Sequence, residues 1–86
     1  MTTGVVPDRE QVGRALRAAL SDAGVYRYEA AEHLGVCRNG LWRKLTGQAP
    51  ISVDEFAAIA DLTGQRVPAL AGQVQAIADR DAGVLP

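Results

Sequence analysis

Residues 27–46 hold two helical segments that are each too short to be stable alone. The first spans residues 27–34, the second runs from residue 38 to residue 45 or 46, and the residues LGVC connect them. Helices of about eight residues are marginal in water, because the first turn fixes several residues for a single hydrogen bond. The two segments must therefore pack against each other and against other helices of the chain.

The residues around this connection have the spacing of a tight helix crossing. Ala31 allows the first segment to approach the second, and Gly35 tolerates the positive φ of a tight turn. Val36 and Leu41 are placed to fill the crossing from the other side. This spacing predicts a helix-turn-helix over residues 27–46.

Three further helices are predicted from capping residues and apolar periodicity. The first begins at the capping residue Asp8 and ends at Gly24. Ser52 and Glu55 form a capping box that starts the fourth, and Pro68, which is favoured at a first helical position, opens the fifth. We therefore expect an all-α, five-helix domain over residues 8–80, with flexible termini at 1–7 and 81–86.

Composition limits the function of the chain. With 86 residues it has room for one modest core. A single cysteine excludes an internal disulfide and a cysteine-based zinc site, and neither a phosphate-binding glycine loop nor a catalytic carboxylate pair is evident. No apolar run approaches a membrane span or a signal sequence. We expect a soluble cytoplasmic protein that is not an enzyme and has no metal, cofactor, small-molecule ligand or membrane partner.

Charge is unevenly distributed along the chain. The nine basic and ten acidic residues give a net charge of −1. Residues 27–47, however, are net positive, with Arg27, Arg38, Arg43 and Lys44 against Glu29 and Glu32. Attraction to phosphate depends on the charge within about 10 Å rather than on the total. This segment is therefore a candidate nucleic-acid surface, although a solvated charged face is the plainer alternative.

One side of the 38–46 segment has side chains suited to reading bases. Leu41 and Leu45 are four residues apart and point to the core, so the remaining positions face solvent. Arg bonds guanine bidentately, Asn bonds adenine, and an indole ring can press on a thymine methyl group. The predicted base contacts are Arg38, Asn39, Trp42 and Arg43, and the predicted backbone contacts are Tyr26, Arg27, Lys44 and Thr46.

Residues 12–70 resemble the lambda-repressor and Cro (XRE) family of helix-turn-helix domains. The matching positions are Ala31, Leu34, Gly35, Val36, Leu41 and Gly47, followed by the stretch ISVDEFAAIADLTG. The stretch LWRKLTGQAPISVDEFAAIA further resembles small regulators of actinobacterial phages and their hosts. The resemblance implies a transcriptional regulator, such as a phage repressor or Cro-like protein, that binds a double-stranded operator.

The chain departs from the family pattern at two helix starts. The family usually begins its second helix with a Ser cap and a phosphate-binding Gln, where this chain has Tyr26 and Arg27. Cys37 stands where the family favours Ser or Thr as the cap of the third helix. We expect Cys37 to be a small half-buried residue, the alternative being a redox-sensitive thiol.

Two questions stay open at the level of sequence. Leu70, Val74 and Ile77 form an apolar stripe that could pair two copies or could close the core of a single copy. Trp42 could face outward or fold over the end of the fourth helix. If the apolar residues bind another protein, the helix-turn-helix would be an interaction module, as in an antitoxin, and would not read DNA.

Overall fold

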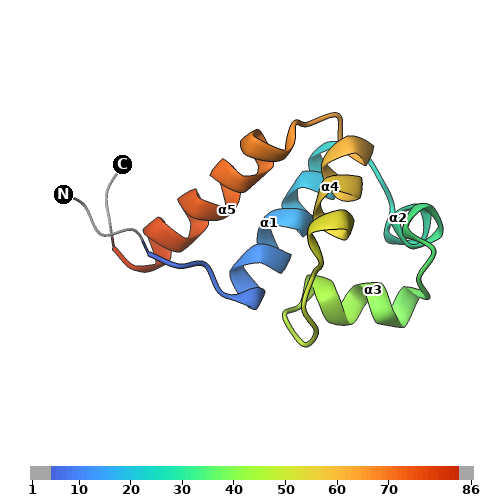
Figure 1. Ribbon diagram of the computed structural model, residues 1–86, viewed down its shortest axis with the longest axis horizontal. Coiled ribbons are helices and arrows are strands. Elements are labelled where there is room, and N and C mark those ends of the chain that lie inside the picture. The colour runs from blue at the N-terminus through green and yellow to red at the C-terminus, as the bar shows by residue number, and fades with distance from the viewer. Residues whose placement is uncertain (1–4, 84–86) are drawn as a thin grey trace.

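The computed structural model describes residues 5–83, and within that range the chain forms helices and no strands (Figure 1). The helices are α1 (Arg9–Asp22), α2 (Arg27–Leu34), α3 (Arg38–Leu45), α4 (Val53–Leu62) and α5 (Val67–Asp81). The predicted all-α, five-helix fold is confirmed.

The predicted helix starts of α1 and α4 are confirmed by their caps. Asp8 Oδ1 accepts a hydrogen bond of 2.9 Å from the N–H of Gln11, whose side chain accepts one of 3.0 Å in return. Ser52 and Glu55 make the same reciprocal pair at 3.1 and 3.0 Å. Pro68 stands at the second position of α5 rather than the first, where a missing N–H is equally harmless.

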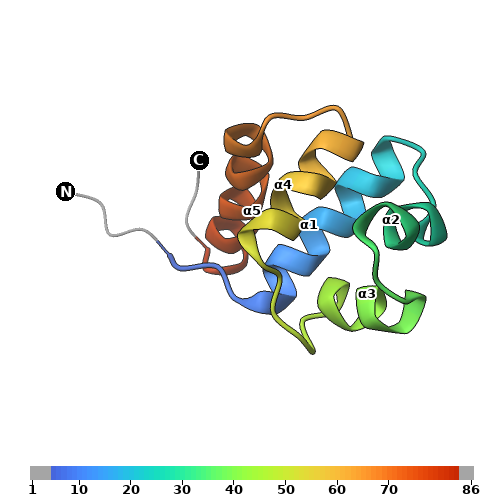
Figure 2. The same cartoon turned by 45° about the vertical axis from the view of Figure 1, so that its right-hand side comes forward.

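Helix α1 lies at the centre of the fold. Figures 1 and 2 both place α5 on one side of it and the α2–α3 pair on the other, with α4 alongside. The largest fully buried side chains come from four helices and are at most 1% exposed: Leu16, Leu41, Leu45, Ile59 and Leu70. Because α1 contacts both α3 and α5, its placement sets the position of α3.

Two glycines allow the N-terminal half of α1 to approach the end of α3 closely. A β-carbon on Gly13 would lie 2.1 Å from the carbonyl oxygen of Leu45. At Gly47, where φ is +84°, a β-carbon would lie 2.8 Å from the backbone of Glu10. Only glycine fits either position with the backbone as it is, so the two residues bring the backbone of α1 into direct contact with the end of α3.

The apolar stripe of α5 closes the core of the single chain. Leu70 is fully buried and Val74 is 5% exposed, while Ile77 is half-buried beside α1. The proposal that Leu70 and Val74 form a dimer surface is therefore wrong, because both side chains are already covered by the chain's own helices. For these two residues the burial supports the other alternative, closure of the chain's own core, and a dimer contact by the half-buried Ile77 stays a prediction.

The helices run from Arg9 to Asp81, and the domain bounds 8–80 stay a prediction. The expected flexible segments fall partly outside the described residues, at 1–4 and 84–86. Asp81, which falls in the predicted flexible segment 81–86, is instead the last residue of α5, and its carboxylate lies 2.9 Å from the Arg14 guanidinium. Hydrogen bonds from Arg14 and Gln11 hold the pKa of Asp81 below its usual range. This pairing joins the end of α5 to α1.

Within residues 5–83, no helix is both long and apolar enough to cross a membrane. The same residues contain no group of three or more His, Cys, Asp or Glu side chains arranged to hold a metal ion.

Candidate nucleic-acid interface

The predicted helix-turn-helix is formed by α2, α3 and a left-handed glycine. Gly35 has φ +70°, and the N–H of Val36 donates a 3.0 Å hydrogen bond to the carbonyl of Ala31. Ala31 is 3% exposed at the helix crossing, and Leu41 is 1% exposed. The turn and the small residue place α3 across α2, as the spacing predicted.

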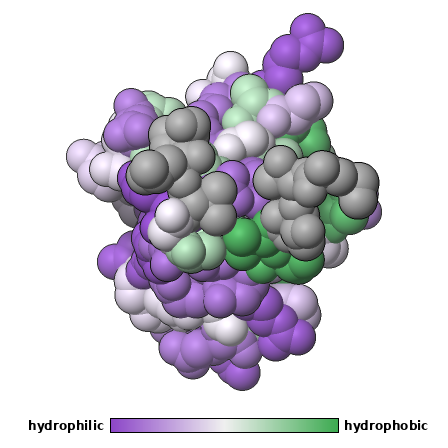
Figure 3. All heavy atoms as spheres, turned by 90° about the vertical axis from the view of Figure 1, so that its left-hand side faces the viewer, coloured by the Kyte–Doolittle hydropathy of each residue, from purple (hydrophilic) through white to green (hydrophobic). Residues whose placement is uncertain are grey.

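The outward side of α3 is exposed, as expected from the burial of Leu41 and Leu45. Arg38, Asn39 and Arg43 all lie at the surface. Neither arginine forms an ion pair within residues 5–83, and the Arg38 guanidinium carbon lies 5.6 Å from the ring centroid of Tyr28. Figure 3 views the molecule from the side of the chain termini, where hydrophilic atoms gather at the lower end of the face. This side of α3 therefore carries unneutralised positive charge.

Lys44 is bound to α4 instead of facing outward. Its ammonium donates to the Glu55 carboxylate, and both side chains are largely buried. The hydrogen bond from Lys44, and to a smaller extent the one from the N–H of Ser52, holds the pKa of Glu55 below its usual range. The expected backbone contact by Lys44 thus competes with an ion pair inside the protein, which the sequence did not reveal.

Thr46 ends α3 with its hydroxyl turned back on the helix. The hydroxyl donates a 2.8 Å hydrogen bond to the carbonyl of Trp42 and accepts one of 3.2 Å from the Gln48 amide. The same carbonyl also accepts a 3.0 Å hydrogen bond from the N–H of Thr46, so the hydroxyl adds a second bond at the helix end. Thr46 has a structural role here, and its hydroxyl keeps one lone pair for a further contact.

Helix α2 begins without a side-chain cap from Tyr26. The N–H of Tyr26 donates a 3.0 Å hydrogen bond to the carboxylate of Glu29, which is the reciprocal half of a capping box. The rings of Tyr26 and Tyr28 are stacked with centroids 5.7 Å apart, and both are exposed. Glu29, at the third helical position, partly replaces the Ser cap of the family pattern, a role that was not predicted from the sequence.

Cys37 caps α3 with its sulfur. The Sγ atom accepts a hydrogen bond of 3.2 Å from the N–H of Gly40, and the residue is exposed. The expectation of a half-buried Cys37 is wrong, because a capping side chain must stay outside the helix to reach the third N–H.

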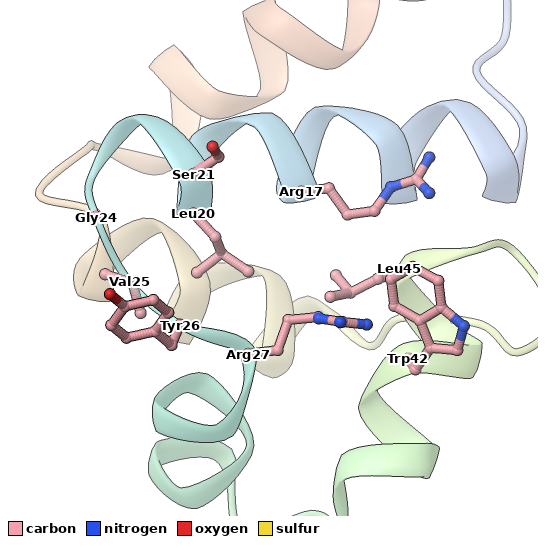
Figure 4. A pocket seen from close by; sticks show the side chains of 9 residues that line it. All are labelled: Arg17, Leu20, Ser21, Gly24, Val25, Tyr26, Arg27, Trp42 and Leu45. Carbon is pink, nitrogen blue, oxygen red and sulfur yellow. The ribbon is translucent and has the colours of Figure 1, made fainter.

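Trp42 lies on the side of α3 that faces α1 and the start of α2. The residue is 40% exposed, and the guanidinium carbons of Arg27 and Arg17 lie 4.2 and 6.0 Å from its ring centroid. The ring borders a pocket of about 380 Å³ whose apolar wall includes Leu20 and Leu45 (Figure 4). Trp42 therefore neither folds over α4 nor faces straight outward.

No protein-family model and no curated protein sequence matches the chain. The fold and the exposed α3, together with the solved structures that are similar to it, define a small helix-turn-helix transcription regulator. The crystal structure of the clp gene regulator ClgR from Corynebacterium glutamicum has a TM-score of 0.82 and 27% identity, over 87% of this chain and 80% of that one. A second ClgR crystal structure has a TM-score of 0.72 and 28% identity, over 79% and 88%.

Proposed function

We propose that the protein binds double-stranded DNA with α3 in the major groove and reads a specific operator. The observation that carries this proposal is the exposed set Arg38, Asn39 and Arg43 on α3, whose two arginines make no ion pair with any residue that the structure describes. An Arg fork matches guanine, an Asn amide matches adenine, and residues near the start of a recognition helix usually reach the bases. Arg38 and Asn39 occupy that start.

The backbone contacts that we propose surround this set. Arg27 and Tyr26 stand at the start of α2, and Thr46 stands at the end of α3. These two helix ends flank the reading side of α3. When α3 lies in the groove, they would therefore face the phosphates that border it. Lys44 contributes only if DNA displaces Glu55 from its ammonium, so we leave it outside the contact set.

The family resemblance suggests how binding would control transcription. A Cro-like or phage-repressor role implies that the bound protein blocks polymerase. A single domain buries only about 600–1,000 Å² against DNA, which favours two copies on half-sites about one helical turn apart. Since Leu70 and Val74 are buried, any pairing must use other surfaces.

DNA binding at several salt concentrations tests this function. Fragments from around the protein's own gene are titrated with the wild type and with the double variant Arg38→Ala, Arg43→Ala. We expect the wild type to select one fragment and the variant to lose that selection, because each bidentate base contact is worth about 1–3 kcal/mol of discrimination.

A matched control separates base reading from charge. The double variant Arg66→Ala, Arg80→Ala removes the same charge from α5 and its cap, away from the reading side. It should keep the selected fragment. If the wild type binds no fragment, or binds all of them equally, α3 is not a reader and the alternative of a protein-interaction module gains support.

A further inference from the structure

Two arginines from different helices converge on the ring of Trp42. Arg27 is the first residue of α2, and its guanidinium carbon is 4.2 Å from the ring centroid, while that of Arg17, on α1, is 6.0 Å away. Figure 4 shows the Arg27 side chain extending toward the indole, with Arg17 projecting from α1 on the other side of the pocket. The three residues lie beside the start of α2, at the edge of the proposed reading side.

The positive charges at this ring are incompletely balanced. Arg17 lies 3.5 Å from Glu10, but Arg14 already binds that carboxylate at 2.5 Å. Arg27 has no ion pair within the described range, 5–83. Two cations thus face one ring, and of the two only Arg17 lies near a carboxylate, which it shares with Arg14. This arrangement favours an anion that contacts both.

The ring can orient a guanidinium without blocking its hydrogen bonds. A guanidinium plane stacks on an aromatic face by cation–π attraction and leaves its N–H edge free to donate to a phosphate. Leu20 and Leu45 are buried on the protein side of the same pocket and limit the water that competes for those N–H groups.

We infer that Trp42 is a positioning residue rather than a base reader: it holds Arg27, with Arg17 as a second arm, in a clamp for one phosphate of the DNA backbone. This inference rests on the proposed function and names the DNA group that the pocket receives. It assigns to Trp42 an effect on affinity that is the same for every DNA sequence. The choice of sequence belongs to Arg38, Asn39 and Arg43.

Salt dependence of binding distinguishes a clamp from a reader. Fluorescence anisotropy with labelled duplexes gives the slope of log K against log salt for the wild type, Trp42→Ala, Trp42→Phe and Arg27→Gln. Loss of one phosphate contact reduces the slope by about 0.9. We expect this reduction in Trp42→Ala and in Arg27→Gln, with equal weakening on selected and unselected fragments, and a largely restored slope in Trp42→Phe.

A double variant tests whether Trp42 acts through Arg27. If it does, Arg27→Gln with Trp42→Ala should bind no more weakly than Arg27→Gln alone. Arg80→Gln removes a charge at the far end of α5 and should keep the wild-type slope. Circular dichroism checks folding, and if Trp42→Ala unfolds, Trp42→Phe and Arg27→Gln decide the outcome.

The single tryptophan gives an independent signal in the absence of DNA. Arg27→Gln should change the emission of Trp42, whereas Arg80→Gln should leave it unaltered. If wild-type binding is selective but Trp42→Ala changes the preferred fragment at an unchanged slope, Trp42 reads bases and the clamp is refuted while the proposed function stands. If the wild type binds no DNA, both fail together.

Discussion

The substitution Gly13→Ala tests the contact between α1 and α3. The added β-carbon would lie 2.1 Å from the carbonyl oxygen of Leu45 and 2.6 Å from its carbonyl carbon. Real β-carbons essentially never come within 3.0 Å of another heavy atom. Both neighbours are backbone atoms that cannot rotate away, so α3 must move off α1 by about 1 Å to restore ordinary contact distances.

The expected loss of stability follows from two opposing effects. Overpacking a core costs about 1–3 kcal/mol, and a rigid backbone neighbour places this site at the upper end. Alanine favours a helix over glycine by about 1 kcal/mol. The free energy of unfolding should therefore fall by about 2 kcal/mol, which lowers Tm by about 8–16 °C in a domain of this size.

Thermal and urea unfolding followed by circular dichroism measures this loss. Gly72→Ala is the matched control, because it makes the same change inside α5 where, apart from the neighbouring backbone of α5 itself, no atom lies within 4 Å of the new β-carbon. The control should gain up to about 1 kcal/mol. An increase in Tm for Gly13→Ala similar to that of Gly72→Ala would refute the close approach of α1 and α3.

Three more perturbations test other contacts. Cys37→Ser should stabilise α3 and Cys37→Ala should destabilise it by up to about 1 kcal/mol in thermal unfolding, because the side chain caps Gly40; equal Tm values would exclude a capping role. Because the pKa of Glu55 is lower in the folded state, the unfolded state binds a proton at Glu55 more readily. The stability that the ionised carboxylate contributes is therefore complete above about pH 4.3 and is lost as the pH falls through the folded pKa. Glu55→Gln should weaken the pH dependence of the urea midpoint across that acid range. An unchanged pH profile would count against the Lys44 ion pair. Leu70→Ala should cost about 2–5 kcal/mol by leaving a cavity, with no change of mass in light scattering; a changed mass at full stability would return Leu70 to a dimer surface.

Local interactions were the predictable part of the fold. The caps at Asp8 and Ser52 and the left-handed turn at Gly35 each depend on residues within four positions of one another. The burial of Leu41 and Leu45 follows from helical period alone. These features together predict five helices and the exposed side of α3.

Contacts between helices were harder to predict. Gly13 has an ordinary place in the α1 pattern, and its importance appears only once Leu45 lies against it. Likewise, Lys44 and Trp42 sit on an exposed stretch in sequence, but the rotation of α3 brings one to Glu55 and the other to Arg27. That rotation depends on packing across the whole domain, and no local pattern encodes it.

The division of α3 into a packed side and an exposed side has a consequence for how such proteins diverge. Leu41 and Leu45 hold the helix in place, whereas Arg38, Asn39 and Arg43 make no contact on which the core depends. Substitutions at these exposed positions should therefore leave stability almost unchanged. Target recognition can then drift or be redesigned one base pair at a time on a constant scaffold, so a library randomised at only these three positions should yield folded proteins with new operators.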